Sequence, residues 1–135
     1  MTASVREAYL DNAATTRVRP EAIEAMMPML TGCYANPSGA HRKAREARRA
    51  LDDARDVMAE VLGAEPGQIV FTAGGTEADN LAVFGVRAKR GGTIVCSAVE
   101  HHAVLHPVEQ LGGRVVGVDP FGLVDLAALE ASLDE

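Results

Sequence analysis

Two glycines and a threonine stand where an apolar run gives way to a helical pattern. Residues 69–71 are apolar, residues 74–76 read Gly-Gly-Thr, and helical periodicity follows at once. The glycines allow a tight turn, and the N–H groups of Gly75 and Thr76 would face an anion at a helix N-terminus. We expect Thr76 to cap this helix, with Asp79 completing a capping box. The segment is neither a Walker loop nor G-x-G-x-x-G, so its spacing fits another kind of phosphate cradle and an ordinary strand–helix turn equally well.

His101 is the second candidate for a chemical role. Residues 97–102 read SAVEHH and lie between an expected strand and an expected helix. Loops that follow parallel strands meet at one edge of a sheet, where ligands bind. The spacing therefore predicts that His101 and the Gly-Gly-Thr loop face one crevice, and a purely structural histidine remains as good an interpretation.

The elements that position these loops follow from hydrophobic periodicity. Pro20 suits a first helical position, Gly32 and Gly63 suit helix ends, and Asp125 suits a cap for the last helix. The order strand–helix repeated after residue 67 indicates an α/β fold with a parallel sheet. We expect an extended segment at 9–11, helices at 20–30, 39–62, 76–86, 103–111 (with Pro107 in its first turn) and from 126 onward, and strands at 69–71, 93–96 and 115–118.

Composition narrows the function classes. The chain has 135 residues, 47% of them hydrophobic, and a net charge of −6, which argues against a nucleic-acid surface. The basic run at 42–49 precedes three aspartates and predicts a solvated helix face.

No signal peptide or membrane-length apolar run is present, so we expect a cytoplasmic protein without a membrane partner. Cys33 and Cys96 have no metal-ligand spacing, and we expect no metal site.

Four sequence blocks resemble the cysteine desulfurases. Residues 9–16 read YLDNAATT, 36–41 read NPSGAH, 71–81 read FTAGGTEADNL and 100–105 read EHHAVL. The last three are similar to the family's NPSSxH, FTSGGTEANNL and EHxAVL. The blocks occur in the family's order and spacing, and the resemblance extends from Tyr9 to the last helix.

The resemblance implies the α/β fold of the fold-type-I pyridoxal-phosphate enzymes, within the class V aminotransferase-like group. Residues 1–66 would form an N-terminal segment with helices, and residues 67–135 the first βα units of an incomplete cofactor-binding large domain. The implied cofactor is pyridoxal 5′-phosphate, and the implied enzyme is a homodimer. Its reaction takes sulfur from L-cysteine and leaves alanine and an enzyme persulfide. A sulfur-acceptor protein then receives the sulfur for iron–sulfur clusters, thio-cofactors or tRNA.

The resemblance also assigns roles to single residues. Gly75 and Thr76 match positions that bind the cofactor phosphate, and His101 matches a catalytic histidine that stacks on the pyridine ring. An imidazole offers a flat face and transfers protons near neutral pH. His41 matches the pattern without an expected catalytic role, and His102 is expected to be structural. The segment near the substrate contributes Asn12, Ala14 and Thr15.

The lysine that anchors the cofactor as a Schiff base has no match in this chain. Its only lysines, Lys43 and Lys89, lack the family's Ser-x-His-Lys context. We expect that lysine, the aspartate under the pyridine nitrogen and the sulfur-carrying cysteine to lie beyond residue 135, so the chain alone would be an inactive N-terminal portion. We expect Cys96 to pack in the core and Cys33 to be the more accessible thiol. The alternatives are a split or degenerate fragment that acts only as a binding partner, and another class V relative such as a selenocysteine lyase.

Overall fold

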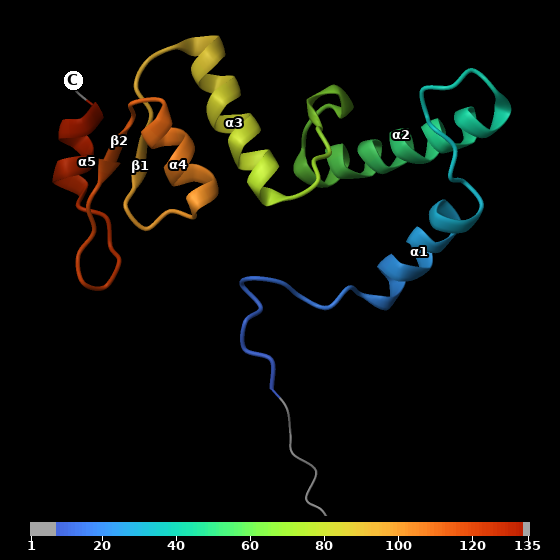
Figure 1. Ribbon diagram of the computed structural model, residues 1–135, viewed down its shortest axis with the longest axis horizontal. Coiled ribbons are helices and arrows are strands. Elements are labelled where there is room, and N and C mark those ends of the chain that lie inside the picture. Colours follow the sequence, from blue (N-terminus) through green and yellow to red (C-terminus); the bar gives the residue numbers. More distant parts are fainter. Residues whose placement is uncertain (1–7, 134–135) are drawn as a thin grey trace, which may run out of the picture. The chain divides into compact units, whose positions relative to one another are not determined.

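The computed structural model describes residues 8–133, which fall into two compact units (Figure 1). The first unit ends at Ile69 and the second begins at Val70. Within residues 8–133, no helix is both long and apolar enough to cross a membrane.

The first unit contains two helices and a short 3-10 turn. They are α1 (Pro20–Thr31), α2 (Arg42–Leu62) and η1 (Pro66–Gln68), and η1 packs against α2. The expected ends are confirmed: Pro20 opens α1, Gly32 closes it, and Gly63 closes α2 in the left-handed region at φ 63°. Helix α2 begins at Arg42 rather than at residue 39, because Gly39 N–H donates to Asn36 O in a turn that precedes the helix.

The basic run of α2 forms the solvated face that its spacing predicts. Arg42 and Lys43 pair with Glu46, with N···O distances of 3.6 and 3.2 Å, and Arg48 pairs with Asp52 at 3.2 Å. The Lys43 hydrogen bond lowers the pKa of the Glu46 carboxyl below its ordinary value. These exposed pairs add little stability.

The second unit alternates helices and strands. Its elements are α3 (Gly75–Arg90), β1 (Val95–Ser97), α4 (His102–Gln110), β2 (Arg114–Val116) and α5 (Leu126–Leu133). The two strands pair in parallel with Cys96 opposite Val115, which confirms the predicted α/β class. Helix α4 packs against both strands and against α3, and α5 packs against the strands (Figure 1).

The core of the second unit lies under α4. Ala103, Val108 and Val116 are buried there, as is Pro107. A Cβ on Gly113 would lie 2.5 Å from Val108 Cγ1 and 2.6 Å from Ile94 O. The turn from α4 into β2 therefore requires a glycine, because any side chain would push the helix off the strands.

Three expected local features are wrong. Residues 69–71 form no strand, because no segment within residues 8–133 pairs with this stretch. Thr76 does not cap α3 and Asp79 completes no capping box: the helix starts one residue earlier, and Glu77 Oε2 accepts from Ala73 N–H at 2.6 Å instead. Pro107 lies in the middle of α4 rather than in its first turn. The Asp125 cap is confirmed, since its Oδ1 accepts from the N–H groups of Ala127 and Ala128.

Candidate functional site

The N-terminus of α3 presents unused hydrogen-bond donors. Gly75 and Thr76 are its first two residues, so their N–H groups have no acceptor inside the helix. Within residues 8–133, no other group accepts from these two N–H groups. The helix dipole adds partial positive charge at the same place. This end of α3 therefore suits an anion such as a phosphate.

The two glycines at the start of α3, Gly74 as its N-cap and Gly75 as its first residue, are not required by the backbone. Gly74 is extended at φ 170°, which any residue adopts, and Gly75 lies in the helix. A Cβ on either residue would meet no atom within 4 Å. The space in front of the loop is a hollow of about 590 Å³ that residues 73–77 and Asn80 line. Neither backbone conformation nor packing requires the absence of side chains here, and the space that they leave would let a ligand approach the backbone closely.

The N-terminus of α4 is closed by its own histidine. His101 is the N-cap residue, and its Nδ1 accepts from Ala103 N–H at 3.1 Å. A ring nitrogen that accepts a hydrogen bond carries no proton, so this arrangement places the ring N–H at Nε2. The side chain is exposed. The cap thus fixes the ring while leaving its faces and Nε2 open to a ligand.

Asn80 joins the two helix starts. Its Nδ2 donates to Thr76 O at 2.9 Å and to Ala103 O at 3.0 Å, which links α3 to α4. Ala103 O is available because Pro107 stands four residues later and has no N–H to donate to it. Sequence reasoning assigned no role to Asn80, although a proline inside a helical pattern indicates that a carbonyl needs another donor.

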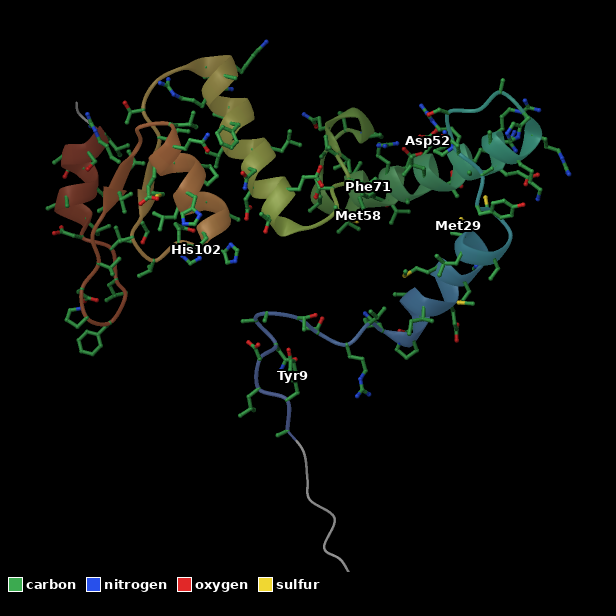
Figure 2. The ribbon with its side chains drawn as sticks, in the orientation of Figure 1. Tyr9, Met29, Asp52, Met58, Phe71 and His102 are labelled. Carbon is green, nitrogen blue, oxygen red and sulfur yellow. The ribbon has the colours of Figure 1, made fainter. Side chains whose placement is uncertain are left out.

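The structure brings Thr76 and His101 to one hollow of about 370 Å³. Besides these two residues it is lined by Asn80, His102, Ala103, His106, Pro107 and Gln110. His102, labelled in Figure 2, lies at the N-terminal end of α4. Thr76 also lines the hollow in front of Gly75, so the open start of α3 and the histidine of α4 share one region.

The expected substrate residues belong to the first unit. Asp11 O accepts from the N–H groups of Ala14 and Thr15, and Asn12 Nδ2 donates to Tyr9 O at 3.4 Å. Asn12 and Thr15 also line a hollow of about 550 Å³ together with Tyr9, Thr16 and Arg17. These residues therefore form an exposed turn of their own, and Ala14 does not line its hollow.

The thiols and lysines differ in their surroundings. Cys96 lies in β1 and is half-buried; burial, followed by the charges of Glu100 and Glu109, raises the pKa of its thiol. A raised pKa disfavours the thiolate that a sulfur carrier needs. Lys43 Nζ is paired with Glu46, and Lys89 lies in the last turn of α3, at the opposite end from Thr76.

An α/β unit with an open helix start beside a histidine that caps the next helix is an arrangement typical of proteins that bind phosphate-containing ligands. The model of the aminotransferase class-V family matches residues 8–135, and the chain belongs to this family. The cysteine desulfurase IscS of Dictyoglomus turgidum is 45% identical over 136 residues, which cover 95% of this chain and 34% of that protein. The chain spans about a third of the length of the curated relatives that it matches.

Two solved structures share the fold. A NifS-like protein is 38% identical with a TM-score of 0.76, and the match covers 89% of this chain and 35% of that one. The structure of SspA in complex with cysteine is also 38% identical, with a TM-score of 0.74, over 88% of this chain and 37% of that one.

Proposed function

We propose that residues 1–135 are the N-terminal portion of a pyridoxal-phosphate-dependent cysteine desulfurase. The enzyme would take sulfur from L-cysteine and leave alanine and an enzyme-bound persulfide. Support comes from the identity to cysteine desulfurases and from the likeness to a protein solved with cysteine. The observation that carries the proposal is the single hollow that Thr76 and His101 share, with Asn80 bonded to both helix starts.

The start of α3, where Thr76 lines both this hollow and the one in front of Gly75, fits the phosphate group of the cofactor. The open N–H groups of Gly75 and Thr76, the helix dipole and the empty space before the glycines provide donors, charge and room. When bound, pyridoxal phosphate supplies an electron sink for the substrate. His101 would stack a ring face on the cofactor and hold a proton at Nε2, because Nδ1 is engaged by the cap. Asn12, Ala14 and Thr15 would lie near the substrate.

The covalent anchor would come from outside residues 1–135. Lys89 is 13 positions from Thr76 along α3, about 20 Å at 1.5 Å per residue. Lys43 is paired with Glu46, and the raised pKa of Cys96 makes that thiol a poor sulfur carrier. The proposal therefore places the lysine, the aspartate and the carrier cysteine in the rest of the polypeptide.

The proposal includes the organisation and partners of the whole enzyme. Residues 1–66 would be its N-terminal segment and residues 67–135 the start of its large domain. The enzyme would act as a cytoplasmic homodimer and pass sulfur to an acceptor protein for iron–sulfur clusters, thio-cofactors or tRNA. Two alternatives stand beside it. Among residues 8–133, no lysine lines the hollow, which favours a split or inactive fragment, and a selenocysteine lyase would share the same cradle.

The test measures alanine release by the full-length polypeptide that contains residues 1–135, supplied with pyridoxal phosphate and either L-cysteine or L-selenocysteine. We expect alanine from L-cysteine and none from residues 1–135 alone. The variants Lys43→Arg and Lys89→Arg are matched controls and should keep full activity. Alanine from selenocysteine alone would indicate the lyase. Alanine from residues 1–135 that Lys89→Arg abolishes would overturn the assignment of the anchor to the rest of the chain.

A further inference from the structure

Two histidines of α4 stand one helical turn apart at the same end of the helix. His102 and His106 have ring centroids 4.8 Å apart, with the ring planes inclined by 40°. Both side chains are exposed, and both line the 370 Å³ hollow. The proposed desulfurase chemistry uses neither of them. Their placement therefore calls for an explanation separate from the cofactor.

The spacing of the two rings matches a shared metal ion. Residues at i and i+4 lie on one helix face, which is how the histidines of H-E-x-x-H bind zinc. With metal–nitrogen bonds of about 2.0–2.1 Å, two imidazoles on one ion have ring centroids roughly 5 Å apart. The observed centroid distance of 4.8 Å is close to this value.

We propose that His102 and His106 bind one divalent transition-metal ion of the class that imidazole favours: zinc, nickel or copper. Water would fill the remaining coordination positions, because residues 8–133 contain no group of three histidine, cysteine or acidic side chains placed to hold a metal. His101 is not a ligand: its ring centroid is 6.2 Å from that of His102, and its Nδ1 is engaged by Ala103 N–H. The site does not depend on the proposed desulfurase activity.

Two opposing electrostatic effects set the strength of this site. The net charge of −6 attracts cations to the chain as a whole. The N-terminal half of α4 carries partial positive charge from the helix dipole, which disfavours a cation. With two protein ligands the site is weaker than a closed structural zinc site. Its affinity should depend on both imidazoles, because a single one leaves a monodentate contact.

The experiment titrates Ni²⁺ into the full-length polypeptide without added cofactor and follows the heat of binding by calorimetry. His102→Gln and His106→Gln each remove one ligand from an exposed position, and far-UV circular dichroism checks that α4 is retained. His41→Asn is the control: His41 caps α2 through Nδ1, and asparagine is also a good N-cap. Because each ligand is essential to the pair, we expect each single variant to lose affinity at least ~10-fold, as with removal of other groups that support a metal.

The outcomes separate clearly. Comparable losses in His102→Gln and His106→Gln, with affinity kept in His41→Asn, support the shared site. A loss in only one of the two variants, or in neither, overturns it. Because the readout is metal binding without cofactor, its failure leaves the desulfurase proposal untouched, and absence of alanine release in the functional test leaves the metal site untouched.

Discussion

The starts of α3 and α4 solve the same physical problem in opposite ways. Both helices line one hollow, and each has backbone N–H groups that its own turns cannot satisfy. Helix α4 satisfies one of them with the His101 side chain, whereas those of Gly75 and Thr76 in α3 have no acceptor within residues 8–133. The open helix start can therefore accept an anion, whereas the closed one holds a ring in position.

A side-chain hydrogen bond also links the two helix starts and replaces a backbone donor that α4 lacks. Pro107 deprives Ala103 O of its helical donor, and Asn80 from α3 supplies another at 3.0 Å. The same Asn80 Nδ2 bonds Thr76 O at the open start. One amide side chain therefore bonds to both helix starts, in addition to the packing of α3 against α4, so this pair of helices should respond to mutation as a unit.

The largest expected effect comes from replacing His101. His101→Asn keeps a side chain that caps α4 but removes the aromatic ring and its Nε2 proton. In the full-length enzyme we expect alanine release from L-cysteine to fall by roughly 10²- to 10⁴-fold, the range of a lost acid–base group. Thermal unfolding should stay close to that of the parent protein.

His101→Ala is the companion variant, since it removes the ring and the cap together. We expect the same loss of activity and an additional destabilisation of about 1 kcal/mol, the usual effect of losing an N-cap. If His101→Asn kept full activity, the ring would have no catalytic role and the histidine would be a cap alone.

The second-largest expected effect, on cofactor affinity, comes from removing an N–H group at the start of α3. Gly75→Pro removes one N–H at the first helical position, where proline fits and the helix makes no use of the donor. The preceding Gly74 is extended, as a residue before proline prefers to be. A hydrogen bond to a charged group is worth about 1.5–3 kcal/mol, so we expect the affinity for pyridoxal phosphate to fall roughly 10- to 150-fold. A fluorescence titration of the cofactor measures this.

Gly75→Ala is the companion variant and tests whether the absence of a side chain at this position matters. It keeps the N–H but adds a methyl group in space that is empty of protein atoms. We expect a loss of cofactor affinity here too, because the phosphate would approach the backbone at this point, while stability is unchanged or slightly improved. Parental affinity in both variants would show that the cradle lies elsewhere.

A smaller effect, on stability, tests the link between the two starts. Asn80→Ala leaves Ala103 O without its donor, and we expect it to lower the free energy of unfolding by about 1–2 kcal/mol. Pro107→Ala restores a helical N–H to the same carbonyl. In that background Asn80→Ala should cost less, and a double-mutant cycle from denaturant unfolding gives the difference. Equal costs in the two backgrounds would show that the compensation is absent.

The sequence predicts most of the elements that depend on near neighbours. Pro20, Gly32 and Gly63 mark helix ends whose causes lie within a few residues, and all three are confirmed. Residues 69–71 have the composition of a strand, but a strand also needs a partner that no local pattern specifies. The predicted cap of α3 is wrong because the helix starts one residue earlier. The carboxylate that accepts a backbone hydrogen bond at this end is therefore that of Glu77.

The candidate functional site also contains residues that local sequence predicts and residues that depend on helix packing. Gly75, Thr76 and His101 could be singled out because each follows an expected strand, and the structure places Thr76 and His101 at one hollow. Asn80 could not be singled out from the sequence, because its two hydrogen bonds depend on how α3 and α4 pack and on a proline in α4. The pairing of His102 with His106 follows from the i, i+4 spacing once α4 is known to include both residues.

The smallest expected effect probes the strand that leads to the closed helix start. Burial, helped by Glu100 and Glu109, raises the pKa of the Cys96 thiol in the folded state. The folded state then holds its proton at a pH where the unfolded chain has lost it, so this contribution to stability is complete below about pH 8.5 and is lost as the pH rises toward the higher folded value. We expect the free energy of unfolding to decline over that range in the parent protein and to decline less in Cys96→Ala. Urea unfolding at a series of pH values measures both curves. Parallel curves for Cys96→Ala and the parent would show that the thiol near the start of α4 is as free to ionise as in the unfolded chain.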